Sequence, residues 1–168
     1  MISDVERVLG ALNASNVRYL VVGGVAVVLH GYLRTTADLD LVIQLGPENV
    51  AKGLEALERL GYRPRAPVPM RGFADEAQRA RWVREKGMVG FSLWSSDHPG
   101  FEVDLFAEEP FDFESVYSRS LEVRLDREFV RVIGLDDLLS MKRSVGRHRD
   151  QEDVEALERL SDGDGQAR

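Results

Sequence analysis

Two aspartates, Asp38 and Asp40, stand two positions apart in the segment TTADLDLVI, and apolar residues alternate with them. Successive side chains of a strand point to opposite faces, so both carboxylates are expected on one face while Leu39 and Leu41 enter the core. Two like charges this close repel each other unless a cation neutralises them. A hard divalent ion such as Mg²⁺ or Mn²⁺ takes oxygen ligands and suits this role. The pair therefore predicts a metal site.

A third carboxylate follows in the segment FEVDLF, at residues 101–106. The same alternation turns Val103 inward and puts Asp104 on the opposite face, where it can join Asp38 and Asp40 from a neighbouring strand. Three carboxylates can hold two metal ions, of which one activates an attacking hydroxyl and the other braces a triphosphate and its leaving oxygens. We therefore predict Asp38, Asp40 and Asp104 as catalytic residues and metal ligands.

Upstream of the acids, Gly23 and Gly24 interrupt an apolar strand expected at residues 19–22. Glycines let backbone N–H groups approach a phosphate closely, and the short helix expected at residues 25–30 adds its N-terminal dipole. Arg34 is a candidate to bind a phosphate oxygen directly. Taken singly, a DLDL strand is more often a solvated face and a double glycine only a turn, but their joint occurrence in this order favours a triphosphate site.

These motifs, GGVAVVLHG, then Arg34, then TTADLDLVI and the later acid, resemble the polymerase beta-like nucleotidyltransferase superfamily. The resemblance covers residues 19–106 and includes Thr36, which precedes the acids as in short bacterial members. It implies a mixed-sheet catalytic core, magnesium, a nucleoside triphosphate donor and release of pyrophosphate. The implied reaction moves a nucleoside monophosphate to an acceptor hydroxyl on RNA, a protein or a small molecule.

A second resemblance lies in the segment LLSMKR and the residues after it. It is similar to the terminal helices of short nucleotidyltransferases from toxin-antitoxin and phage-defence systems, which implies that Lys142 contacts the triphosphate and that a cognate toxin or antitoxin is a partner. Asp150 either joins the site, pairs with Arg147 or caps the last helix. Two alternatives stay open: an antitoxin-like or defence-system binding protein, and an antibiotic nucleotidyltransferase, whose usual aromatic and histidine are replaced here by Val25 and Thr36.

The elements that must position these residues alternate between helix and strand, which predicts an α/β (α+β) domain with a mixed β-sheet and flanking helices. We expect helices from Ser3 to about residue 13 and at 47–60, 75–86, 135–143 and 150–160, and strands at 38–43, 88–94, 101–106, 121–125 and 129–133. The length of 168 residues fits a single domain at 1–160 with a flexible tail at 161–168.

Composition limits the remaining classes of function. The chain has no cysteine and a net charge of −7, which exclude thiolate chemistry and argue against a general nucleic-acid coat. The segment 63–86 is net positive and could receive an acidic or RNA acceptor, although a solvated basic helix explains it more simply. No apolar run is long enough to span a membrane, so a cytoplasmic protein is expected. The three histidines are too scattered to form a ligand set.

Overall fold

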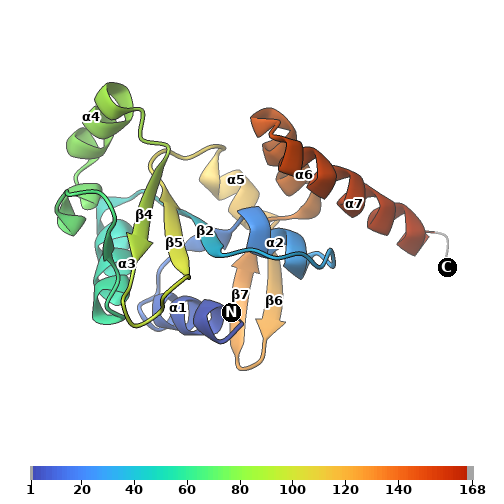
Figure 1. Ribbon diagram of the computed structural model, residues 1–168, viewed down its shortest axis with the longest axis horizontal. Helices are drawn as coiled ribbons and strands as arrows, with labels where there is room; N and C mark the ends of the chain where they lie inside the picture. The colour runs from blue at the N-terminus through green and yellow to red at the C-terminus, as the bar shows by residue number, and fades with distance from the viewer. Residues whose placement is uncertain (1, 166–168) are drawn as a thin grey trace.

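The computed structural model describes residues 2–165, and in this part of the chain seven strands form one mixed sheet in the order β3-β4-β5-β2-β1-β7-β6 (Figure 1). The strands are β1 (Tyr19–Val21), β2 (Asp38–Ile43), β3 (Arg63–Pro64), β4 (Gly90–Trp94), β5 (Glu102–Phe106), β6 (Leu121–Leu125) and β7 (Glu128–Val132). The helices are α1 (Ile2–Ala14), α2 (Gly23–Leu29), α3 (Pro47–Arg59), the 3-10 turn η1 (Met70–Ala74), α4 (Glu76–Lys86), α5 (Phe113–Ser118), α6 (Leu135–Val145) and α7 (His148–Gly165). The expected α/β fold with a mixed sheet is confirmed.

The centre of the sheet joins strands that are far apart in the sequence. β2 pairs antiparallel with β1 and parallel with β5, and β4 pairs antiparallel with β5, so the expected hairpin at residues 88–106 is present. β1 also pairs in parallel with β7. These pairings put β2 and β5, the two acid-bearing strands, next to each other in the middle of the sheet.

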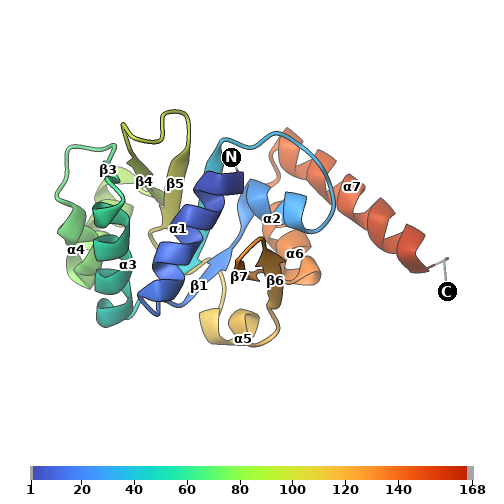
Figure 2. The same cartoon turned by 90° about the horizontal axis from the view of Figure 1, so that it is seen from below.

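Helices α1 and α3 lie side by side against one face of the sheet (Figure 2). Leu39 and Leu41 of β2 and Val103 and Leu105 of β5 are almost completely buried, as the alternation of these strands predicts. On the other side, α2, α6 and α7 lie together, and α7 extends away from the sheet (Figure 1). The acidic positions of β2 and β5 therefore face away from the α1–α3 core layer.

Several elements differ from the sequence-based expectation. The expected connection after residue 62 contains β3 and η1, and α5 was missed because six residues give too little periodicity to recognise. Residues 161–165 continue α7, because Ser161 and Asp162 lack apolar spacing but do not break a helix, and the division into a domain at 1–160 and a tail at 161–168 stays a prediction. Residues 166–168 lie outside the described part of the chain.

Among residues 2–165, the structure contains no helix that is both long and apolar enough to cross a membrane.

Candidate functional site

The three predicted carboxylates lie on two neighbouring strands in matched register. Asp40 of β2 stands opposite Asp104 of β5, and Asp38 stands opposite Glu102. Asp38, Asp40 and Asp104 all line one cavity of about 450 Å³. The structure therefore brings together the three acids that the alternation of the two segments predicted, and their chemical roles stay predictions.

The electrostatics of the acids are those of crowded, partly buried like charges. Burial and the neighbouring Asp104 raise the pKa of Asp40 to about 6, against a usual value of 3.8, and the Gly24 backbone N–H only partly offsets this. Burial, Asp104 and Glu102 likewise raise the pKa of Asp38. One carboxylate oxygen of Asp104, Oδ1, is buried and accepts no hydrogen bond. The cluster thus stores unfavourable negative charge that a bound cation would relieve.

Gly23 and Gly24 lie directly behind the acids, at the start of α2. Gly23 adopts φ +62°, and a Cβ there would lie 1.9 Å from Asp40 Oδ2. A Cβ on Gly24 would lie 2.5 Å from Thr36 Oγ1 and 2.9 Å from a terminal nitrogen of Arg34. The helix expected at residues 25–30 begins instead at Gly23, so the glycines form its first turn. Only glycine fits where this turn touches β2 and the segment before it.

Arg34 and Lys142 share one buried acid, Asp153 of α7. Arg34 Nε lies 2.9 Å from Asp153 Oδ1 as an ion pair, and its terminal NH2 donates to Oδ2 at 3.1 Å. Lys142 Nζ lies 2.7 Å from Asp153 Oδ2 and 3.0 Å from Asp150 Oδ1. The Asp153 side chain is 1% exposed. Both predicted phosphate-binding cations are therefore fixed by α7 rather than free in solution.

Thr36 and Asp150 complete the predicted residues of the site. The Thr36 hydroxyl donates to the Asp38 carbonyl oxygen at 3.2 Å, so it supports the start of β2. Asp150 pairs with Lys142 and also accepts from the Arg147 backbone N–H at 3.3 Å. Asp150 therefore both neutralises Lys142 and satisfies a backbone donor at the start of α7.

All the predicted site residues line the same 450 Å³ cavity, together with residues that the sequence analysis did not single out for it. The lining residues are Gly23, Gly24, Arg34, Thr36, Asp38, Asp40, Val89, Gly90, Ser92, Asp104, Phe106, Leu138, Met141, Lys142, Val145, Arg147, Arg149 and Asp150. Arg149 was missed as a site residue, and its guanidinium donates to the Thr35 carbonyl at 2.5 Å. The cavity is therefore lined by cations and by apolar residues as well as by the acids.

Asp153 is the main residue whose place the sequence reasoning did not find. Asp150, Asp153 and Leu157 recur three and four positions apart, which places them on one face of a helix. Leu157 is buried, so this spacing could have identified Asp153 as an acid on the inward face of α7.

The described residues contain no group of three or more histidine and carboxylate side chains that is already arranged to hold a metal ion. Asp40 and Asp104 nevertheless fit a cation between them, since their strands are in register, the pKa of Asp40 is raised and Asp104 Oδ1 lacks a partner. Together with Asp38, which lines the same cavity, they stay the predicted metal ligands.

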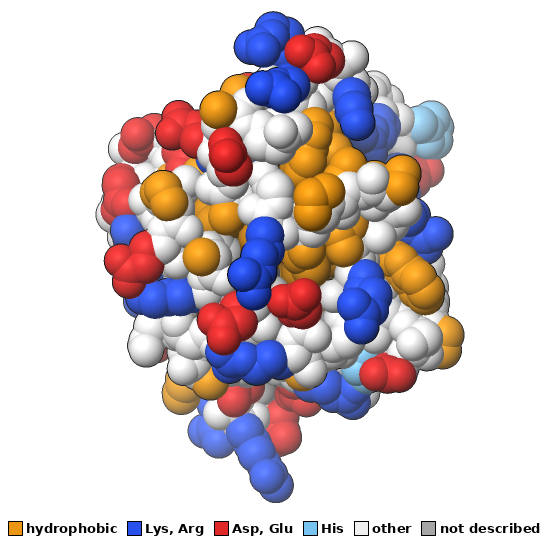
Figure 3. All heavy atoms as spheres, turned by 90° about the vertical axis from the view of Figure 1, so that its left-hand side faces the viewer, with side chains coloured by type: hydrophobic (Ala, Val, Ile, Leu, Met, Phe, Trp, Pro, Cys, Tyr) orange, Lys and Arg blue, Asp and Glu red, His pale blue; other side chains and the backbone are white. Residues whose placement is uncertain are grey.

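The net-positive segment 63–86 lies away from this cavity, and several of its cations have structural partners. Arg65 pairs with Glu102, and Arg79 is buried and donates to the Phe73 carbonyl at 2.6 Å. On the face that carries α3 and α4, acidic and basic side chains alternate around exposed hydrophobic ones, with no continuous basic surface (Figure 3). The His30 Nε2–H group donates to the Ile133 carbonyl oxygen at 2.8 Å, as expected for a packed histidine.

Comparison with known proteins gives one family and several similar folds. The sequence matches the family described as "Nucleotidyltransferase of unknown function (DUF6036)" over residues 2–162. No curated protein matches the sequence. The structure is similar to the lincosamide antibiotic adenylyltransferase LnuA in its lincomycin-bound form, with a TM-score of 0.62 and 16% identity over 93% of this chain and 95% of that one.

Two further solved structures share the fold. The antibiotic-resistance factor ANT(2'')-Ia gives a TM-score of 0.56 and 15% identity over 99% of this chain and 93% of that one. An antigenic nucleotidyltransferase-like protein from Paracoccidioides brasiliensis gives a TM-score of 0.51 and 16% identity over 95% of this chain and 76% of that one. At these identities the likeness shows a common fold.

Proposed function

The chain belongs to the family of nucleotidyltransferases of unknown function, and from that premise we propose that it transfers a nucleoside monophosphate from a nucleoside triphosphate to an acceptor hydroxyl. We further propose that residues 1–160 act as one catalytic unit. The observation that carries the proposal is the register of Asp40 with Asp104, which joins a carboxylate of raised pKa to a buried, unpartnered carboxylate oxygen.

In the proposed reaction, the acceptor oxygen forms a bond to the α-phosphorus of the donor. The bond from that phosphorus to the oxygen bridging to the β-phosphate breaks, and pyrophosphate leaves. The proton of the acceptor hydroxyl passes to Asp104, whose Oδ1 has no competing hydrogen-bond donor. Asp38 and Asp40 would hold the cation. When bound, Mg²⁺ or Mn²⁺ would supply positive charge to the triphosphate and its leaving oxygens.

The phosphates of the donor are proposed to lie against the cationic side of the cavity. Gly23 and Gly24 leave room for close approach of the phosphates to the backbone, because no side chain intervenes there. Arg34 and Lys142 supply charge, and Asp153 fixes the positions of both. This pre-positioning lowers the entropy lost when the triphosphate binds.

The proposal is tested with each of the four nucleoside triphosphates, labelled at the α-phosphate, in the presence of Mg²⁺ and a panel of hydroxylated acceptors. We expect label transfer by the wild type and loss of at least about 100-fold in rate for Asp104→Asn. Donor binding by calorimetry should survive in that variant. Glu122→Gln is the control, since Glu122 is exposed on β6 and does not line the cavity. Equal rates in the wild type and Asp104→Asn would reject the proposed role.

The cognate toxin or antitoxin partner stays a prediction from the sequence resemblance. None of the similar proteins named above is described as a toxin or antitoxin. The alternative function as an antibiotic nucleotidyltransferase is supported by the fold more than by the sequence motif. Two of the similar structures are antibiotic-modifying or resistance proteins, although this chain has Val25 and Thr36 where an aromatic residue and a histidine are usual.

A further inference from the structure

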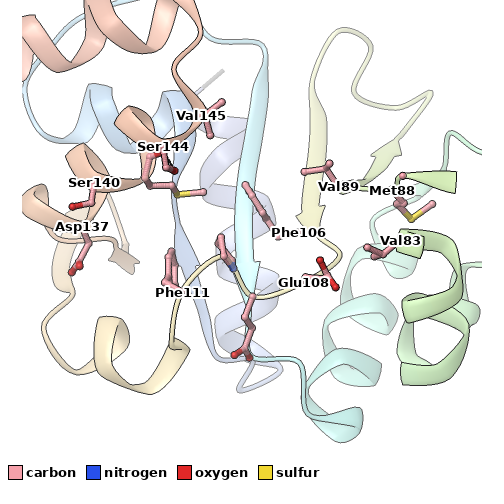
Figure 4. Close-up of a pocket in the computed structure, with 14 residues that line it drawn as sticks. Val83, Met88, Val89, Phe106, Glu108, Phe111, Asp137, Ser140, Ser144 and Val145 are labelled. Atoms are coloured by element: carbon pink, nitrogen blue, oxygen red, sulfur yellow. Dashed lines mark hydrogen bonds between the residues drawn. The ribbon is translucent and has the colours of Figure 1, made fainter. Parts of the chain in front are cut away.

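A second cavity, of about 600 Å³, adjoins the site described above (Figure 4). The two cavities share the side chains of Val89, Phe106, Met141 and Val145 as a common wall. The volume falls within the roughly 300 to 1,000 Å³ that is typical of sites for small molecules. The two cavities therefore adjoin along these four side chains.

The position of the second cavity is on the Asp104 side of the acids. Phe106 and Glu108 follow Asp104 along the chain and line it, and Val89 approaches from the segment before β4. Gly23, Gly24 and Arg34, which form the proposed phosphate side, do not line it. The cavity is thus placed where an acceptor would present its hydroxyl to Asp104.

The walls of this cavity are mostly apolar, and every charged side chain among its lining residues is acidic. Val83, Met88 and Phe111 extend the apolar wall, and the three charged residues are Glu108, Glu109 and Asp137 (Figure 4). Asp137 is already neutralised by a two-pronged ion pair with Arg119, with both N–O distances at 2.7 Å. The net charge that the cavity offers a ligand therefore comes from the two glutamates.

Glu108 and Glu109 are exposed carboxylates at this cavity. Glu108 has no hydrogen-bond or ion-pair partner among the described residues. Glu109 accepts the Leu45 backbone N–H at 3.3 Å and interacts electrostatically with Arg79 without forming an ion pair. An RNA or nucleotide bound here would place phosphates next to these charges, which repel them. An amine or guanidine would be attracted.

We propose that this second cavity is the acceptor site and that it takes a small, partly apolar cation bearing a hydroxyl group. The inference rests on the proposed function and names the acceptor class for it. The apolar wall holds the body of the molecule, Glu108 and Glu109 bind its cationic group, and its hydroxyl reaches Asp104 past Phe106.

The test uses matched pairs of probes that differ in charge: N-benzylethanolamine and its N-acetyl derivative, and tobramycin and its fully N-acetylated form. Binding to the intact protein is measured by ligand-observed NMR at millimolar concentration. The Glu108→Gln, Glu109→Gln variant keeps the shape of the cavity. The Glu58→Gln, Asp162→Asn variant removes the same charge from exposed positions outside it. Ser140→Trp fills the cavity from a residue that does not line the donor site.

We expect the charged probes to bind more tightly than their acetylated partners. The Glu108→Gln, Glu109→Gln variant should bind the charged probes more weakly, on the order of 3- to 10-fold, and salt should reduce this difference. The control variant should match the wild type. Ser140→Trp should abolish probe binding and leave the affinity for nucleoside triphosphate unchanged.

Three results would overturn the acceptor site. The first is binding of the charged and the acetylated probes with equal affinity. The second is that Ser140→Trp weakens the binding of nucleoside triphosphate as much as that of the probes, which would make the cavity a donor site. The third is label transfer to RNA at a rate that the Glu108→Gln, Glu109→Gln variant leaves unchanged. Each can occur while the wild type still binds triphosphate and releases pyrophosphate. Loss of those two activities from the wild type would instead reject the proposed function itself.

Discussion

Replacing Asp40 with asparagine is expected to stabilise the protein while destroying its activity. The side chain keeps its size and an oxygen that can accept the Gly24 N–H, but it loses the charge that burial and Asp104 disfavour. The folded-state pKa is about 6 and the usual value is 3.8. At about 1.36 kcal/mol per pH unit, the ionised carboxylate costs about 3 kcal/mol of unfolding free energy above pH 6.

The sign of the pH dependence follows from the raised pKa. The folded state binds a proton more tightly than the unfolded state, so this group destabilises the protein at high pH and the penalty disappears as the pH falls from about 6 to below 4. The advantage of Asp40→Asn should therefore be about 3 kcal/mol at pH 8, roughly half of that at pH 5 and small at pH 4.

Urea unfolding with EDTA, at those three pH values, measures this difference directly. At pH 8 the melting temperature should rise by about 6 to 12 °C, from the usual scaling for a chain of this length. Asp136→Asn, at an exposed position of α6, is the control and should change little. A variant no more stable than the wild type at pH 8, or an advantage independent of pH, would show that the charge of Asp40 does not destabilise the folded state.

Two further substitutions probe how the site is built. Gly23→Ala should lower the free energy of unfolding by several kcal/mol and abolish activity, because the added Cβ would lie 1.9 Å from a carboxylate oxygen of Asp40 on β2. The control is Gly87→Ala, because Gly87 has the same φ of +62° but no atom within 4 Å of the added Cβ. Gly87→Ala should cost only about 1 to 2 kcal/mol in chemical unfolding. Asp153→Ala should leave the positive charges of Arg34 and Lys142 without the buried carboxylate that both contact, which should lower the stability by about 3 kcal/mol. The binding of triphosphate, measured by calorimetry, should also weaken. Unchanged binding in a folded variant would show that Asp153 does not position these cations.

The sequence was sufficient to predict the central strands and the acids on them. Acidic and apolar residues alternate over the first four positions of β2 and of β5, so the face that Asp38, Asp40 and Asp104 occupy follows from the period of a strand. The match of Asp40 to Asp104 in register did not follow, because it depends on pairing between strands more than 50 positions apart. The alternation of residues in a strand determines which face of the sheet a side chain occupies, but not which residue lies opposite it on the neighbouring strand.

The residues contributed by α6 and α7 were harder to predict. Lys142 was identified only through a resemblance, and its neutralisation by Asp153 depends on how α7 packs behind α6, which no local pattern records. The acceptor-side cavity is another such case. Its apolar wall comes from separate segments, α4, β5 and α6 among them, and each apolar residue taken alone reads as ordinary core.

The central claim is that Asp38 and Asp40 bind a nucleoside triphosphate together with a divalent cation. Calorimetric titration of each triphosphate, with and without Mg²⁺, into the wild type and the Asp38→Ala, Asp40→Ala variant tests it most directly. We predict Mg²⁺-dependent binding by the wild type and its loss in the variant, which should remain folded by circular dichroism. The claim would be contradicted if the two proteins bound equally, or if neither bound metal or triphosphate.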